Sequence, residues 1–184
     1  QEVKILAVGI PFPHRRFEDL LTAVRLLRGK GINALCTIAG DYDGGHPHVK
    51  KLQEFAISEG VRDHISITGR VPDAEFLRLY QESDVFVFPS HLQSWGLAVF
   101  EAMSSGLPVI VSETSGAAEI LENGKTAFIV PAKSPEAIAD AVLGLIRDPA
   151  LYRMLSEEGR KFVASGLSWT RYADEMLKIF ASVK

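Results

Sequence analysis

The middle of the chain runs Asp84-Val85-Phe86-Val87-Phe88-Pro89-Ser90-His91-Leu92-Gln93-Ser94-Trp95-Gly96-Leu97-Ala98-Val99-Phe100-Glu101-Ala102-Met103. The unbroken apolar run at 85–88 is typical of a strand that is buried on both faces. Pro89 ends this run, a polar loop follows, and an amphipathic helix begins near Gly96. A buried strand that leads through a loop into a helix is the repeating unit of an open α/β sheet.

The same unit recurs on both sides of this stretch. Strands are predicted at 3–9, 34–40, 64–68, 84–89, 108–112 and 127–130. Helices between them are predicted at 17–28, 49–58, 74–81, 97–105 and 135–146. This alternation predicts a doubly wound, Rossmann-like parallel sheet of six strands, with helices on both faces. Two further helices, at 150–164 and 169–183, follow without a strand between them.

Length and composition favour a single globular domain over residues 1–184. Apolar residues make up 47% of the chain, and the net charge of −3 shows no clustering of cations. Nucleic-acid binding normally needs such a cluster, so we expect no nucleic-acid partner. The single cysteine, Cys36, lies in an apolar strand, where we expect a buried, inert thiol and a reducing, cytoplasmic location. No apolar run approaches the roughly 20 residues that span a bilayer.

The glycine-rich segment 44–48 is predicted to be a surface loop. It contains His46 and His48, with Asp41 and Asp43 nearby. Metal ligation by this group is possible on residue type, but two histidines in a flexible loop are more often exposed to solvent. We therefore expect no metal site.

Ligands of an open parallel sheet bind beyond the carboxyl ends of its strands. In the loop at 89–96, the amides of Gly96, Leu97 and Ala98 precede a helix and suit a phosphate. Glu101, one turn further along, suits the hydroxyls of a ribose, or else it merely complements the helix dipole. Both interpretations of Glu101 stay open.

Two other loops after strands carry cations. Arg15 and Arg16 follow the first strand, where a guanidinium can hold phosphate oxygens or can simply be solvated. Arg70 lies in the loop Gly69-Arg70-Val71-Pro72, after the third strand.

Taken together, these segments resemble the C-terminal domain of glycosyltransferase family 4, whose members have the two-domain GT-B fold. The resemblance rests on Gly69-Arg70-Val71-Pro72 through Tyr80, Asp84 to Ser90, Gly96 to Glu101, Ala102-Met103-Ser104-Ser105-Gly106-Leu107-Pro108-Val109-Ile110, Gly116 to Gly124, Pro131 and Ser168-Trp169. It covers essentially the whole chain, in order and without a gap through the signature.

The resemblance implies a retaining, metal-independent hexosyltransferase. Its donor substrate would be a nucleotide-diphosphate sugar, with no other cofactor. Glu101 matches the second glutamate of the family's E-x7-E motif and should bind the donor ribose. Arg15 takes the place of the pyrophosphate-binding lysine, and the backbone near Val71 should contact the base. The backbone at Ser94, Trp95, Gly96, Leu97 and Ala98 should face the sugar and the diphosphate.

The chain departs from the family pattern at two positions. Gln93 stands where the family has the first glutamate of E-x7-E, and Ile10 stands where it has an arginine. Arg16 or Arg70 is a candidate to replace that missing cation. Two alternatives follow from these departures: a degenerate domain that binds a nucleotide or a partner without turnover, and half of a sugar-nucleotide epimerase.

A complete enzyme of this family would be about twice as long. We therefore expect an acceptor domain before residue 1, which would bind a sugar, glycan or lipid-linked acceptor, and we expect the fragment alone to be inactive. Membrane association of the full-length enzyme is compatible with this role. The helix at 169–183 should cross back to the acceptor domain, so its apolar residues should be unusually exposed.

Overall fold

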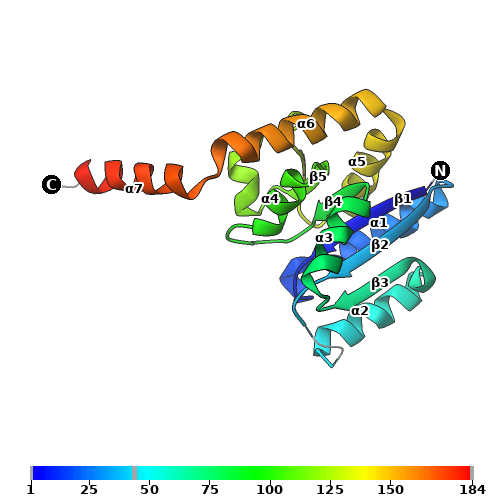
Figure 1. Cartoon of the computed structure of the whole chain (residues 1–184). Helices are drawn as coiled ribbons and strands as arrows, with labels where there is room; N and C mark the ends of the chain where they lie inside the picture. Colours follow the sequence, from blue (N-terminus) through cyan, green and yellow to red (C-terminus); the bar gives the residue numbers. More distant parts are fainter. Residues whose placement is uncertain (1, 43–44, 183–184) are drawn as a thin grey trace.

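A computed structural model describes residues 2–42 and 45–182 as a six-stranded, all-parallel sheet covered by helices (Figure 1). The strands are β1 (Glu2–Val8), β2 (Asn33–Ala39), β3 (Ile65–Gly69), β4 (Val85–Phe88), β5 (Val109–Ser112) and β6 (Phe128–Val130). Their order across the sheet is β3-β2-β1-β4-β5-β6. The predicted doubly wound α/β fold is confirmed.

Helices lie on both faces of the sheet. They are α1 (Phe17–Gly29), α2 (Pro47–Ser58), α3 (Asp73–Glu82), α4 (Leu97–Ser104), α5 (Pro135–Arg147), α6 (Pro149–Gly166) and α7 (Trp169–Ser182). Three short 3-10 helices, Pro13–Arg15, Arg62–His64 and Gly116–Ile120, were not predicted. Helices α1, α2 and α5 pack on one face, whereas α3 and α4 pack on the other.

The alternation of side chains along the central strands explains why they carry consecutive apolar residues, as at 5–8 in β1 and 85–88 in β4. In β1, Ile5 belongs to the core cluster beneath α1 and α5, whereas Leu6 belongs to the cluster beneath α3 and α4. In β4, Val87 and Phe88 divide in the same way. Successive side chains of a strand point to opposite faces, so a strand that is covered on both sides needs no polar position.

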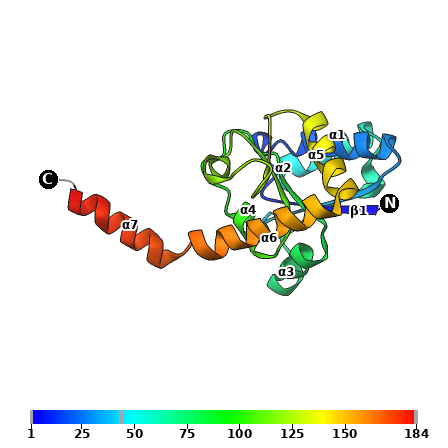
Figure 2. The same cartoon turned by 90° about the horizontal axis from the view of Figure 1, so that it is seen from above.

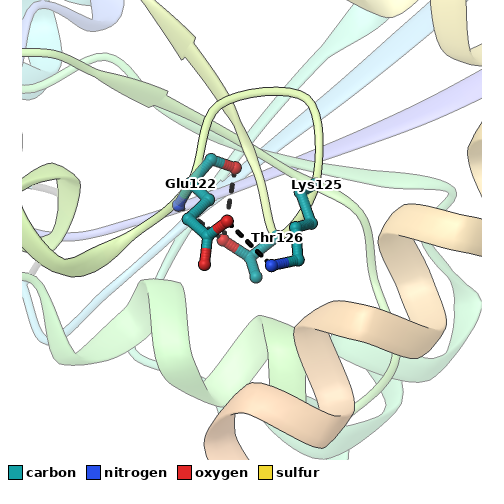
Figure 3. Close-up of polar contacts among 3 residues, drawn as sticks. All are labelled: Glu122, Lys125 and Thr126. Atoms are coloured by element: carbon teal, nitrogen blue, oxygen red, sulfur yellow. Dashed lines mark hydrogen bonds and ion pairs between the residues drawn. The ribbon is translucent and has the colours of Figure 1, made fainter.

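A tight turn leads the chain into β6 (Figure 3). Within it, Thr126 Oγ1 accepts a hydrogen bond of 2.8 Å from the amide of Glu122, and Lys125 Nζ lies 2.8 Å from Glu122 Oε2. Gly124 has a φ of 76°, a backbone conformation that glycine adopts without strain. Local side-chain contacts therefore close this turn.

The last helix extends away from the rest of the domain. Helices α6 and α7 meet at a bend, and α7 projects as an arm in both views (Figures 1 and 2). Several of its large apolar side chains are exposed, with Leu177 at 65% and Phe180 at 64%. The predicted exposure of this helix is confirmed for the part of it that the structure describes, which ends at Ser182.

The prediction for the segment 44–48 was partly wrong. Gly44 lies outside the described residues, but α2 already begins at Pro47 because proline suits the first turn of a helix. His46 and His48 are partly buried, with ring centroids 5.2 and 5.9 Å from that of Phe12. These aromatic contacts draw both histidines onto the domain. Among the described residues, no group of three His, Cys, Asp or Glu side chains is arranged to hold a metal.

None of the helices in the described ranges has the length and apolar character that crossing a membrane requires.

Candidate functional site

The order of the strands reverses direction between β1 and β4, and in open parallel sheets a crevice beyond the carboxyl ends of the strands is expected at this point. The chain leaves β1 toward β2 and leaves β4 toward β5, so the two following loops separate there. One hydrogen bond of 2.7 Å, from the amide of His91 to the carbonyl of His14, ties these loops together. A cleft of about 340 Å³ lies beside it, lined by Val8, Gly9, Ile10, Arg15, Gly40, Asp41, Gly69, Arg70, Val71, Asp73 and Phe76.

Glycines form the narrow backbone wall of this cleft. A Cβ atom on Gly40 would lie 2.6 Å from the carbonyl oxygen of Gly9. A Cβ atom on Gly69 would lie 2.7 Å from the carbonyl oxygen of Tyr42, and Gly69 also has a φ of 68°. Glycine at these two positions therefore lets the chain segments after β1, β2 and β3 pack closely against one another beside the cleft.

Arg15 brings a cation to the lining of the cleft, and none of the described residues forms an ion pair with it. The 3-10 helix Pro13–Arg15 carries it, and its Cζ lies 5.6 Å from the centre of the Phe88 ring. Within the described part of the chain, its buried Nε has no hydrogen-bond partner. Burial lowers the pKa of the Arg15 guanidinium. A partly buried donor of this kind is suited to an anionic ligand.

Arg16 is held differently, although it is adjacent in sequence. Its Nε and one terminal nitrogen donate hydrogen bonds of 2.8 and 2.6 Å to the two carboxylate oxygens of Asp19, which is only 6% exposed. The hydrogen bond to Asp19 is the main reason why the pKa of Arg16 is raised. Of the two adjacent arginines, Arg15 therefore has a donor available for a ligand, whereas the donors of Arg16 are bound by Asp19.

Arg70 and Val71 border the same cleft as Arg15. The Arg70 side chain is exposed, and its Nε lies 3.7 Å from Asp41 Oδ1. An exposed pair at this distance holds the side chain weakly, so Arg70 can turn toward a ligand at little cost.

The loop before α4 is fixed by the loop that follows β5. The amide of Gly116 donates to the carbonyl of Gln93 at 2.8 Å, and the amide of Ala117 donates to the carbonyl of Trp95 at 3.0 Å. A Cβ atom on Gly116 would overlap the carbonyl oxygen of Ser94, so glycine permits the contact. The backbone of the predicted sugar-facing segment is thus rigidly placed.

Gly96 turns the chain from this loop into α4. Its φ of 119° is a conformation that L-residues rarely adopt, and a Cβ atom there would lie 3.0 Å from the Phe88 ring. Leu97 and Ala98 are the first residues of α4, where amides have no partner within the helix. The helix therefore presents its positive end toward the side of the sheet on which the crevice lies.

Glu101 has a partner that sequence reasoning missed. Its Oε2 accepts a hydrogen bond of 2.8 Å from the hydroxyl of Tyr80, a buried residue of α3. Glu101 is itself exposed and, with Trp95 and Leu97, lines a second, wider groove of about 1110 Å³ that extends to α6 and α7. The structure thus places the predicted residues in two adjoining regions, with Arg15, Arg70 and Val71 in one and Trp95, Leu97 and Glu101 in the other.

Sequence reasoning also missed Thr114, which contacts the polar loop after β4. Its Oγ1 lies 3.3 Å from His91 Nδ1 and 3.4 Å from the amide of Leu92, so it supports the start of the polar loop. A single threonine after a strand carries no sequence signal for this role, because the contact spans more than 20 residues along the chain.

The strand order and the crevice define a Rossmann-like domain. Residues 1–162 match the family described as glycosyl transferases group 1, and the chain belongs to this family.

Relatives and solved structures agree with this assignment. The chain is 31% identical over 164 residues to a GDP-mannose-dependent alpha-(1-6)-phosphatidylinositol monomannoside mannosyltransferase of Mycolicibacterium smegmatis, covering 85% of this chain and 42% of the relative. It is 25% identical over 179 residues to the alpha-D-kanosaminyltransferase of Streptomyces kanamyceticus, covering 97% of this chain and 45% of the relative. The chain thus spans less than half the length of these curated relatives.

Among solved structures, the sucrose-phosphate synthase of Thermosynechococcus elongatus superposes with a TM-score of 0.85 at 25% identity, covering 98% of this chain and 45% of that one. Anabaena HepE in complex with UDP-glucose has a TM-score of 0.85 at 16% identity, covering 99% of this chain and 49% of that one, and shows the fold alone. The domain has the architecture of one half of a GT-B glycosyltransferase.

Proposed function

We propose that this chain is the donor-binding domain of a retaining glycosyltransferase, which transfers a hexosyl group from a nucleotide-diphosphate sugar to an acceptor. The observation that carries the proposal is the partly buried Arg15, which meets no anion within residues 2–42 and 45–182 and stands at the switch point of the sheet. A GDP-mannose-dependent relative and a structural neighbour in complex with UDP-glucose support the same class of donor.

The diphosphate of the donor is the ligand that this site fits best. Its negative charge would satisfy the Arg15 guanidinium, and charge-assisted hydrogen bonds of this kind contribute about 1.5–3 kcal/mol each. The free amides of Leu97 and Ala98 and the positive end of α4 would stabilise the same charge. Arg70 would add a second cation from the lining of the same cleft, so the proposed binding needs no metal ion.

The remaining parts of the donor would occupy the neighbouring surfaces. The ribose would bind Glu101, the base would lie against the backbone near Val71, and the sugar would face Gln93 and the fixed loop that follows it. The acceptor would bind to a domain outside this chain, so the domain alone would transfer nothing.

Thermal unfolding with UDP, GDP and ADP tests the proposal. A nucleotide present at 100 times its dissociation constant stabilises the protein by about 2.7 kcal/mol, a rise of several degrees in Tm. We expect one of the three to produce this shift, and we expect Arg15→Gln to abolish it. Arg25→Gln is the matched control, because Arg25 pairs with Glu59 at the surface and does not line the cleft. Equal shifts for the two variants would remove Arg15 from the site.

A second candidate function, nucleotide binding without turnover, is favoured by Gln93. An amide can hydrogen-bond a sugar hydroxyl but brings no negative charge to an oxocarbenium-like transition state. Sugar transfer by the full-length protein, measured beside its Gln93→Glu variant, separates the two functions. Turnover by the natural sequence rules out the second, and turnover by the variant alone supports it. The anomeric configuration of the product reports whether transfer is retaining.

A further inference from the structure

A row of buried aromatic rings connects the two charged residues of the proposed donor site. The ring of Tyr80 stacks on Phe86 at a centroid distance of 6.1 Å, and Phe86 stacks on Phe88 at 6.4 Å. Arg15 lies over Phe88, and the hydroxyl of Tyr80 reaches Glu101 at the other end. All three rings are at most 4% exposed, so the row is part of the core.

The core sets the position of the Tyr80 hydroxyl. Besides its stacking on Phe86, the Tyr80 ring meets Phe76 edge-on, with centroids 5.3 Å apart and planes at 83°. A ring packed on two sides has little freedom to turn, so its hydroxyl is a fixed donor. Glu101, by contrast, is an exposed side chain on α4, and an exposed glutamate without an anchor samples many rotamers.

We infer that Tyr80 is a positioning residue for donor binding: its hydroxyl holds one oxygen of Glu101 so that the other faces the ribose hydroxyls. This inference rests on the proposed function. Tyr80 donates to Oε2 alone, which leaves Oε1 and a second lone pair on Oε2 to accept from the ligand. Burial, reinforced by the hydrogen bond to Glu101, raises the pKa of Tyr80, so the hydroxyl keeps its proton at neutral pH.

A purely structural role for Tyr80 makes a different prediction. If the hydroxyl only satisfies its own hydrogen bond, its removal would lower the stability of the domain and would affect all ligands alike. If it orients Glu101, its removal would weaken only those ligands that carry the ribose hydroxyls. A nucleotide without these hydroxyls therefore distinguishes the two roles.

The test is calorimetric titration of the 1–184 chain and its Tyr80→Phe variant. The ligands are UDP, GDP and ADP, followed by the 2′,3′-dideoxy form of the nucleotide that binds. We expect Tyr80→Phe to weaken ribonucleotide binding by about 2- to 10-fold, the cost of immobilising one side chain. Binding of the dideoxy form should stay unchanged. Tyr152→Phe is the matched control, because Tyr152 lies on α6 near Asp84, at the amino end of β4.

Each other outcome has a definite meaning. Equal weakening of both nucleotides, or of neither, by Tyr80→Phe overturns the positioning role while the donor site stands. Glu101→Ala, measured in the same way, should remove the preference for the ribonucleotide; if it does not, the ribose is bound elsewhere and the inference fails. If none of the three nucleotides binds, the proposed function fails first. A melt of each variant confirms that the titrated protein is folded.

Discussion

Replacing Gly40 with alanine would perturb the closest backbone contact of the proposed site. The new Cβ atom would lie 2.6 Å from the carbonyl oxygen of Gly9, 2.8 Å from its carbonyl carbon and 3.1 Å from the Tyr42 ring. Contacts of this type normally begin at about 3.4 Å, so the ends of β1 and β2 must separate by roughly 0.8 Å. Both neighbours at Gly9 are main-chain atoms, which cannot move aside as the tip of a side chain can.

Overpacking of this kind costs about 1–3 kcal/mol. In a chain of this length each kcal/mol changes Tm by about 2–4 °C, so Gly40→Ala should lower Tm by about 2–12 °C. Because Gly9 precedes the loop that carries Arg15, the nucleotide-induced shift should also decrease. Differential scanning calorimetry with and without nucleotide measures both effects.

Gly144→Ala provides the control, with an expected effect of opposite sign. Gly144 lies within α5, and a Cβ atom there would meet nothing within 4 Å. Alanine should therefore stabilise the helix by about 0.5–1 kcal/mol. A Gly40→Ala protein as stable as the natural one, or a destabilised Gly144→Ala, would refute the use of these contacts to predict energies.

Two further predictions concern ionisable groups in the core and at the site. Burial raises the pKa of the Cys36 thiol from 9.0 to about 12, so iodoacetamide at pH 8 should label it only after denaturation. As pH rises, the thiol of the unfolded chain ionises before the buried thiol does. The protonated Cys36 thiol therefore makes its full contribution to the free energy of unfolding below pH 9 and loses it between pH 9 and about 12. Urea titrations at several pH values should show this loss for the natural chain but not for Cys36→Ala. Arg16→Ala should destabilise the domain by about 1–3 kcal/mol, because it leaves the buried Asp19 carboxylate without its partner, and adding Asp19→Asn should recover part of the loss. An Arg16→Ala midpoint in urea equal to that of the natural chain would show that this ion pair contributes nothing.

The architecture could be predicted because its signals are local. The run that became β4 is apolar at every position, and β1 is apolar from Ile5 to Val8. Ser134, Pro135 and an apolar stripe indicated helix α5. Every predicted helix and strand lies within two residues of its observed bounds, apart from the end of α7, which falls at the limit of the described residues. The 3-10 helices were missed because three to five residues are too few to show a period.

Side-chain partners had no such signal. Sequence alone proposed both Arg15 and Arg16 as phosphate ligands. The structure shows that Arg16 binds Asp19, only three residues further along the chain, and that Arg15 lies over Phe88 of the distant strand β4. Tyr80 and Glu101 lie 21 positions apart, and they meet because α3 and α4 cover the same face of the sheet.

The amino-acid sequence by itself therefore determined which segments form strands and helices and which loops follow the strands, because hydrophobic periodicity acts over a few residues. Only the tertiary structure decided that Asp19 holds Arg16, that Arg15 Nε has no hydrogen-bond partner among the described residues, and that Tyr80 holds the Glu101 carboxylate. Those outcomes depend on the strand order and on the packing of helices against the sheet. Both bring together side chains that are far apart in the chain, and the sequence separation of two residues does not predict their distance in space.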